Sequence, residues 1–241
     1  MCVVIVLILS LSADYLTRYV PFRYEQSLAQ SFDEQFNKPH EFDGVLGPLG
    51  DKLAVAMELP KDIEITVHYA DEDVVNAFAT FGGHVMIYRG LVEKLESENA
   101  LAMVLAHEIA HIKHRHPIRT LGRGAVVMLA LLAFAGVQGG DLVGDVAGNA
   151  GSLTLLGFSR AQESEADASA LDAVQRVYGH TAGALDLYDV LLDEHEKAGL
   201  TIPVFLSTHP LTTERIATLR ALARERGWPD TGEIAPLSRQ E

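Results

Sequence analysis

The segment 101–116 holds the residues of this sequence best suited to metal chemistry. It reads LAMVLAHEIAHIKHRH, in which His107, Glu108 and His111 form an HExxH motif within an apolar helical pattern. Residues four apart lie on one face of a helix, so the two imidazoles can bind a single metal ion. Glu108 lies beside them, where it can take a proton from an activated water. The alternative, two buried histidines that are only hydrogen-bonded, would leave polar groups in an apolar helix in need of partners.

A catalytic zinc ion needs a third protein ligand and keeps one position for water or substrate. A third histidine soon after HExxH would require glycine at position 114 and histidine at position 117, where the sequence has His114 and Pro117. A carboxylate from a later helix is the other solution, and Glu163 is the candidate. Asp167 shares its helical face and can orient a ligating histidine. Glu165 is an alternative ligand, and a solvated acidic face is the alternative to a site.

Further histidines extend this picture. His114 and His116 end the HExxH helix, and we expect them to cap carbonyls or face solvent. His114 shares a face with His111 but lies too far along the axis from His107 to share the same ion. His209 lies in STHPLTTERI, where it could stabilise an oxyanion or close the fourth zinc position. Arg215 could help at the site or pair with a carboxylate. A turn histidine and a surface arginine are the alternative reading of these two residues.

Helices must carry these residues. Ser97 is a suitable N-cap for the HExxH helix, and Pro117 would stop that helix near His116. A second strong helix spans 159–178 and carries Glu163. Apolar periodicity predicts further helices at 44–59, 183–197 and 213–226.

A small sheet precedes the HExxH helix. Residues 63–69 alternate as a strand, and two shorter strands, 77–80 and 84–88, flank a Gly82–Gly83 pair that is typical of a hairpin. The expected fold is therefore α+β and mostly α-helical. In it, the HExxH active-site helix packs with a second Glu-bearing helix, and a small antiparallel sheet lies at the cleft edge.

Length and composition exclude several classes of function. The 241 residues are enough for one sizeable domain. The formal net charge is −14, and no basic patch stands out, so nucleic acid is not an expected partner. Cys2 is the single cysteine, which excludes an intrachain disulfide and a thiolate metal cluster. Oxidising and reducing compartments both stay open.

Two apolar runs suggest contact with a membrane. Residues 1–13 are almost wholly apolar but short for a spanning helix, so we expect 1–22 to be an uncleaved anchor, with a cleaved signal or a core helix as alternatives. Ala125–Ala135 is too short to cross a bilayer, and it could pack over the site or dip into a membrane surface. The glycine-rich stretch after it could act as a lid.

Three motifs in order resemble one family. HEIAH, then SRAQESEAD, then STHPLTTERI, with NAFATFGGHVMIYRGL before the first, resemble the gluzincin metallopeptidase family of HtpX, BepA, mitochondrial Oma-type proteases and CAAX prenyl endopeptidases. The resemblance covers residues 44–220. It is far more specific than HExxH alone.

The resemblance implies a role for each candidate residue. His107, His111 and Glu163 would bind one zinc ion per chain, with Glu108 as general base and Asp167 behind the ligands. His209 would correspond to the family's downstream histidine, which can lie over the metal. Asn76 and Ala77 would lie on an edge strand, where a substrate segment could add as an extra strand.

The expected function is zinc-dependent endopeptidase activity on unfolded or membrane-associated proteins, in envelope quality control. The alternative is a zinc-containing holdase or assembly factor with a latched, weakly active site. The expected organisation is a hydrophobic anchor or signal at 1–22, a zinc metallopeptidase domain at 23–228 and a polar, frayed tail at 229–241. Relative to the resembling families this looks like a minimal, membrane-tethered core, placed at a bacterial inner membrane or periplasm. The partners would be a polypeptide substrate and the membrane; the oligomeric state is not predicted.

Overall fold

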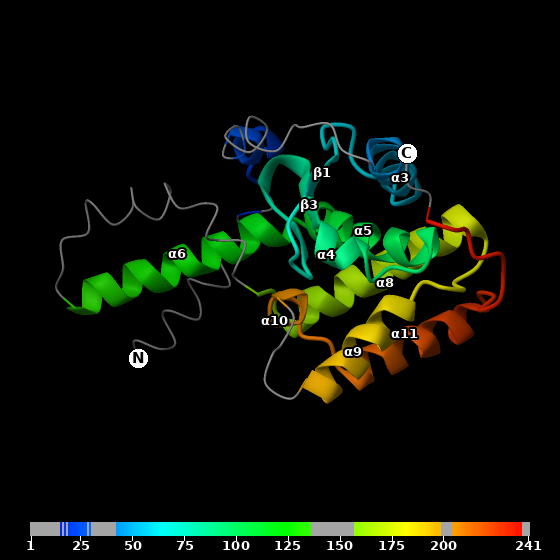
Figure 1. The fold of residues 1–241 in the computed structure, drawn as a ribbon. Helices are drawn as coiled ribbons and strands as arrows, with labels where there is room; N and C mark the ends of the chain where they lie inside the picture. Colours follow the sequence, from blue (N-terminus) through cyan, green and yellow to red (C-terminus); the bar gives the residue numbers. More distant parts are fainter. Residues whose placement is uncertain are drawn as a thin grey trace.

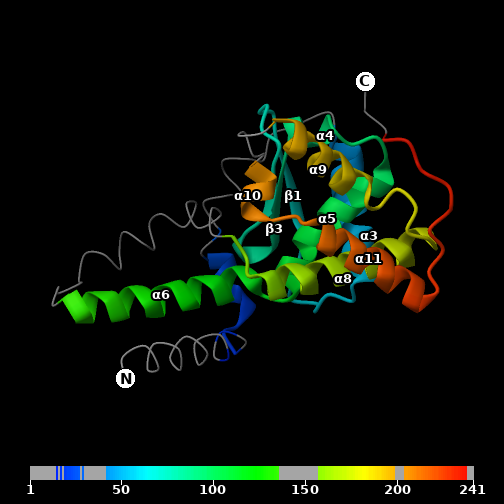
Figure 2. The same cartoon turned by 90° about the horizontal axis from the view of Figure 1, so that it is seen from below.

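The computed structural model describes residues 15, 17, 19–27, 29, 42–135, 157–198 and 204–237. Two helices form its centre: α5 (Glu98–Lys113) and α8 (Arg160–Tyr178) make the most extensive contact between elements. Figure 1 shows α5 enclosed by α3 (Asp43–Ala56), the sheet and α8. In both views α6 (His116–Ala135) runs outward from this body (Figure 2).

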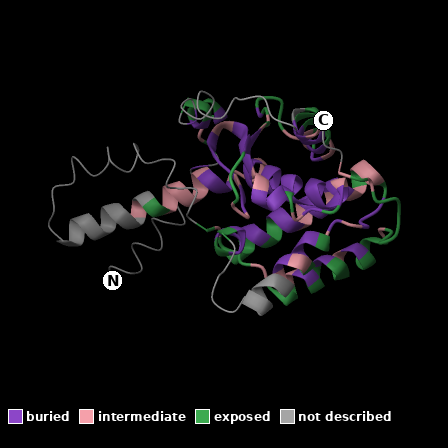
Figure 3. Ribbon diagram, in the orientation of Figure 1, coloured by how far each residue is buried: buried purple, intermediate pink, exposed green. Residues whose placement is uncertain are grey.

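The helix α5 is buried along almost its whole length (Figure 3). A helix that is apolar all round is stable only where it is surrounded by protein, and the run from Ala100 to Ile112 meets this condition. Its first turn is capped as the sequence predicts, because the Ser97 side chain accepts a hydrogen bond from the Ala100 N–H. Its end differs from the prediction: Pro117 does not stop a helix but lies in the first turn of α6, a position proline tolerates.

The helix α8 begins at a capping box in which Ser159 and Gln162 satisfy each other's backbone N–H groups. Its buried face carries Ala166, Ala170 and Ala173, whose small side chains let it approach α5 closely. Behind it pack α9 (Asp186–Ala198) and α11 (Thr213–Arg226), and the short α10 (Val204–Thr208) and α4 (Arg89–Val92) complete the described helices.

The sheet has three strands, β1 (Thr66–Ala70), β2 (Ala77–Ala79) and β3 (His84–Tyr88), in the order β1-β3-β2. β2 and β3 form the predicted antiparallel hairpin. A Cβ on Gly83, whose φ is +95°, would lie 1.9 Å from the Glu64 carbonyl oxygen, so glycine is required in that turn.

One detail of the predicted fold is wrong: the sheet is mixed rather than antiparallel, because β1 pairs with β3 in parallel. The segment 71–76 carries the chain past β1, and β3 then inserts between the first two strands. Alternation in a sequence records which residues face a core but not the direction of a neighbouring strand. The fold class itself, α+β and mostly helical with a small sheet beside the HExxH helix, is confirmed.

The C-terminal segment is packed rather than frayed as far as Leu237. The Glu98 N–H donates to the Ala235 carbonyl at 2.9 Å, and the Ala235 N–H donates to Asn99 Oδ1 at 2.9 Å. Ala235 and Pro236 therefore attach this segment to the start of α5, and a polar composition failed to predict this because the contacts use backbone groups.

Most of the predictions for the apolar segments concern residues that the structure does not describe. Residues 1–14 and the glycine-rich stretch 136–156 lie outside the described residues. Within the described part, no helix combines the length and apolar character needed to traverse a bilayer.

Candidate active site

The predicted ligands converge in space. His107 and His111, one turn apart on α5, have their Nε2 atoms 3.0 Å apart. On α8, Glu163 Oε2 lies 3.4 Å from His107 Nε2, and Glu163 Oε1 lies 3.6 Å from His111 Nε2. Donors bound tetrahedrally at zinc distances are about 3.3 Å from each other. The three residues therefore have the spacing that one such ion requires.

His209 adds a fourth donor atom. Its ring follows α10 and stacks on Phe205 with centroids 4.9 Å apart. Its Nδ1 lies 3.2 Å from both His107 Nε2 and Glu163 Oε1, so the four residues form one buried group of possible metal donors. The resemblance implied a downstream histidine over the metal, and the structure brings His209 into the same group as His107, His111 and Glu163.

The charges of the site favour a cation. Three carboxylates, those of Glu108, Glu163 and Asp167, are buried within it, and Arg215 is the guanidinium that contacts them among the described residues. Burial opposes positive charge on His107, yet hydrogen bonds that its ring donates to Asp167 and Glu163 raise its pKa to about 10. A divalent cation would neutralise the remaining charge of this cluster.

Two buried oxygens support the same conclusion. Glu108 Oε1 and Glu163 Oε2 accept no hydrogen bond within the described part of the chain. Burial raises the pKa of Glu163, but the adjacent His209 and His107 outweigh it and hold that pKa well below its usual range. A buried carboxylate oxygen without a hydrogen-bond donor is costly unless a cation faces it. Arg215 faces Glu163 Oε2 at 3.1 Å, whereas Glu108 Oε1 has no such guanidinium among the described residues. The donor set therefore fits a metal ion.

Asp167 and Arg215 form an ion pair that contacts the proposed ligands. Asp167 Oδ1 lies 3.0 Å from His107 Nδ1, and Arg215 donates to both Asp167 oxygens at 2.8 Å. Arg215 Nη2 also lies 3.1 Å from Glu163 Oε2, and Nη1 donates to the Pro210 carbonyl at 2.8 Å. Of the two roles the sequence allowed for Arg215, the geometry favours pairing with carboxylates, since its donors already face them.

The edge strand β2 meets Glu108 directly. The Ala79 N–H donates to Glu108 Oε2 at 2.8 Å. Tyr88 donates to the Asn76 carbonyl, which makes Asn76 a hydrogen-bonded partner of β3. Residues alternate along an antiparallel pair, so the backbone groups of Ala77 and Ala79 point away from β3, toward the open edge. Of the two predicted edge residues, Ala77 thus has the outward orientation and Asn76 does not.

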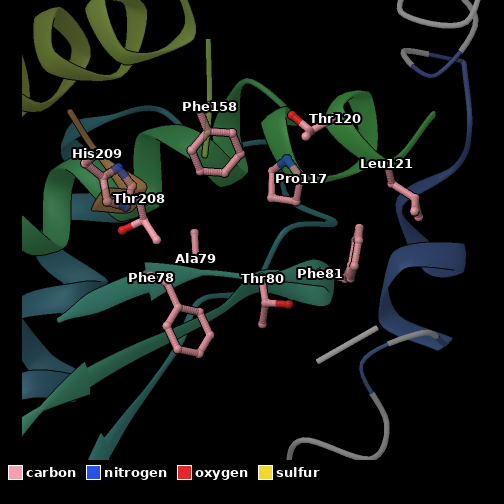
Figure 4. Close-up of a pocket in the computed structure, with 10 residues that line it drawn as sticks. All are labelled: Phe78, Ala79, Thr80, Phe81, Pro117, Thr120, Leu121, Phe158, Thr208 and His209. Atoms are coloured by element: carbon pink, nitrogen blue, oxygen red, sulfur yellow. The ribbon is translucent and has the colours of Figure 1, made fainter. Parts of the chain in front are cut away.

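A narrow pocket runs from this edge to the start of α6 (Figure 4). Its lining carries no carboxylate, lysine or arginine, and aromatic and aliphatic side chains dominate it. The residues are Phe78, Ala79, Thr80, Phe81, Pro117, Thr120, Leu121, Phe158, Thr208 and His209. One end reaches His209, so the pocket adjoins the candidate metal group.

The prediction that His116 caps a carbonyl or faces solvent is wrong. His116 is fully buried, with Nδ1 2.8 Å from His111 Nδ1 and Nε2 3.1 Å from Glu165 Oε2. Burial lowers the pKa of His116 to about 4. Glu165 does not belong to the donor group, but it contacts His116, which in turn contacts His111. The Phe158 ring stacks on the His111 ring, with the two centroids 3.9 Å apart. Residues five apart lie on different faces of a helix, so the spacing of His111 and His116 does not predict their contact.

Comparisons with known proteins agree with this geometry. The chain is 32% identical over 167 residues to the beta-barrel assembly-enhancing protease of Escherichia coli K12, covering 64% of this chain and 34% of that protein. It is 34% identical over 211 residues to a protease HtpX homolog of Methylibium petroleiphilum, covering 73% of each chain. It is 31% identical over 169 residues to the mitochondrial metalloendopeptidase OMA1 of Schizosaccharomyces pombe, covering 68% of this chain and 48% of that protein.

The chain spans about one third of the length of the beta-barrel assembly-enhancing proteases that it matches. The family model of peptidase family M48 matches residues 43–223, which include every candidate site residue. Since this match covers well over half of the sequence, the chain belongs to peptidase family M48, the metallopeptidase family that its three motifs resemble.

Proposed function

We propose that this chain is a zinc-dependent endopeptidase that hydrolyses peptide bonds in unfolded or membrane-associated proteins. The observation that carries the proposal is the convergence of His107, His111 and Glu163 from two helices on one buried point. Zinc held there would act as a Lewis acid toward a water molecule and toward the scissile carbonyl. One ion per chain is expected, since the described residues contain one such group.

Glu108 is proposed as the general base. Its Oε2 is held by the Ala79 N–H, while Oε1 accepts no hydrogen bond from the described residues and faces the donor group. Oε1 would take the proton of the attacking water and deliver it to the leaving amine nitrogen. His209, whose Nε2 lies 3.4 Å from Glu108 Oε1, is the group placed to meet a developing oxyanion once it moves off the ligands.

The substrate would bind as an extended segment along β2. The outward backbone groups of Ala77 and the carbonyl of Ala79 offer hydrogen bonds to an added strand, while the Ala79 N–H is held by Glu108. The adjoining pocket would take one side chain of that segment, and its uncharged lining favours an apolar one. Affinity for the substrate would come from hydrogen bonds to the backbone of β2, and selectivity among substrate side chains would come from the pocket.

A second candidate function rests on His209. With its Nδ1 within 3.2 Å of both His107 Nε2 and Glu163 Oε1, this ring occupies the side of the group where water or substrate would enter. A chain held in this arrangement would act as a latched holdase or assembly factor that cleaves rarely. The two functions differ in how easily the His209 ring moves away from the donor group.

We further propose the organisation expected from the sequence, with an anchor at 1–22, a catalytic domain at 23–228 and an attached C-terminal segment. The apolar composition of residues 1–13 and the bacterial relatives support a place at an inner membrane or in the periplasm. Membrane attachment, like the substrate, belongs to the proposal.

The test is metal analysis combined with casein digestion by the purified full chain. The expected result is about one zinc per chain, digestion that a chelator abolishes, and recovery on adding Zn²⁺ back. Digestion that persists after the metal has been removed would contradict the proposal. Stoichiometric zinc without digestion would favour the latched alternative.

A further inference from the structure

The His111 ring is held by another histidine. The Nδ1 atoms of His111 and His116 lie 2.8 Å apart, both side chains are fully buried, and the rings meet at an interplanar angle of 65°. In contrast, His107 is held by a carboxylate, that of Asp167. The two histidines of the HExxH motif therefore have different outer partners.

An unusual backbone turn makes this contact possible. Arg115, between α5 and α6, has a φ of +60°, a left-handed backbone that is unfavourable for a residue with a side chain. Its guanidinium holds the turn by donating to Glu25 and, at 2.9 Å, to the Val20 carbonyl. On an uninterrupted helix His116 would point away from His111; the turn brings its ring back against it.

Glu165 completes the chain of contacts. Its Oε2 lies 3.1 Å from His116 Nε2, and it comes from α8, two residues after Glu163 and two before Asp167. Residues two apart on a helix face nearly opposite ways. Glu163 and Asp167 therefore reach the HExxH face of α5, while Glu165 reaches around to the corner between α5 and α6.

The proton positions follow from the donors and acceptors. If His111 binds metal through Nε2, its proton is on Nδ1, which must then donate. His116 Nδ1 must accept, so the His116 proton is on Nε2, from which it donates to Glu165. Every ring nitrogen in this series has one role, and the carboxylate at its end selects the tautomer.

We propose that His116, oriented by Glu165, is a positioning residue that holds His111 Nε2 toward the metal. The inference rests on the proposed function, since it requires His111 to be a ligand. It makes α8 the support of the entire centre: Glu163 supplies a donor, Asp167 orients His107, and Glu165 orients His111 through His116.

The test compares the Zn²⁺ dissociation constants of full-length variants, measured by competition with a chromophoric chelator. H116L removes the acceptor, and we expect binding about 10- to 100-fold weaker. In H116N the amide oxygen replaces Nδ1 as the acceptor, so binding should stay within about threefold of the unsubstituted chain. H114Q is the matched control, because His114 contacts Ser169 and Glu165 at the same corner but no proposed ligand. It should bind as the unsubstituted chain does.

Binding by H116L equal to that of the unsubstituted chain would overturn the inference, and so would H116N as weak as H116L, which would indicate packing alone. If H116L does not fold, E165A and E165Q replace it, because Glu165 is about half exposed. The amide of E165Q can still accept from His116, so E165A should bind Zn²⁺ at least about threefold more weakly than E165Q. Equal binding by these two would contradict the role of Glu165. Failure of the proposed function is distinct: the unsubstituted chain would then bind no Zn²⁺, or would bind Zn²⁺ without digesting casein.

Discussion

Glu108 accepts a hydrogen bond from the backbone N–H of Ala79 at 2.8 Å. This contact joins the proposed general base on α5 to the strand proposed to bind substrate. One carboxylate oxygen is thereby held in place and the other is left facing the donor group. The position of a bound substrate strand and the position of the base are set by the same residue.

Replacing Glu108 with Gln should separate catalysis from metal binding. The amide oxygen still accepts from Ala79, but the side chain can no longer take a proton, so kcat should fall by about 10²- to 10⁴-fold. Zinc content, measured by metal analysis, should not change. E108A is the comparison: it also leaves the Ala79 N–H without its partner and should lower the free energy of unfolding by about 1–3 kcal/mol. Loss of zinc from E108Q would mean that Glu108 is structural.

Replacing His209 with Ala separates the two proposed functions: if the His209 ring closes the open position of the centre, as the latched alternative requires, proteolysis should increase. In the structure its ring lies among the proposed ligands, and removing it opens that side of the centre without removing any of the three proposed donors. Casein digestion per mole of bound zinc is the measurement. A lower rate would instead make His209 catalytic, as a group that stabilises the oxyanion.

Replacing Arg215 with Ala should destabilise the centre strongly. The Asp167 and Glu163 carboxylates would lose the guanidinium that faces them in a buried setting, which costs about 3 kcal/mol of unfolding free energy. R220A is the matched control on the same helix, since its ion pair with Asp189 is about half exposed and worth about 0–1 kcal/mol. Chemical denaturation followed by circular dichroism measures both. Equal effects of the two substitutions would show that Arg215 does not support the site.

Replacing Asn99 with Ala should loosen the C-terminal segment. The Ala235 N–H would lose its acceptor, at a cost of about 1 kcal/mol in unfolding free energy. Protease sensitivity of residues 229–237 should rise with it. I234A, which shortens a side chain that is half exposed in the same segment, should change neither quantity. If N99A also changes neither, the packing of the tail is not a stabilising contact.

Replacing Leu121 with Asp should impair cleavage through the pocket. A charge placed in this apolar lining disfavours a bulky apolar substrate side chain, and kcat/KM for such peptides should fall by about 10-fold or more. Zinc content should stay unchanged. L222D, on α11 and outside this lining, serves as the control. An unchanged kcat/KM for L121D would place the side-chain pocket elsewhere.

Much of the centre could be predicted because its parts are local. The spacing of His107 and His111 depends only on the helix, and the Ser97 and Ser159 caps depend on residues within one turn. Glu163 could be named as a candidate because it shares a helical face with Asp167 and because its motif resembles a known family. For this reason the positions of the three proposed ligands differ little from the expectation.

The errors share a different cause. The prediction that His116 caps a carbonyl or faces solvent fails because the chain turns at Arg115, whose left-handed backbone the sequence does not signal. The direction of β1 depends on which strand inserts beside it, and the packing of residues 229–237 depends on backbone hydrogen bonds to α5. None of these is encoded in the spacing of side-chain types.

The amino-acid sequence alone determined the chemistry available to this protein: two imidazoles and a carboxylate at helical spacing, a second acidic helix, and the motifs of peptidase family M48. Only the tertiary structure decided how these groups are held: His209 lies among the proposed ligands, Arg215 pairs with Asp167, and His116 contacts His111. The physical reason is range. Periodicity and capping act within a few residues, whereas the contacts that orient a buried ligand join segments up to about a hundred residues apart and exist only once α5 and α8 have packed.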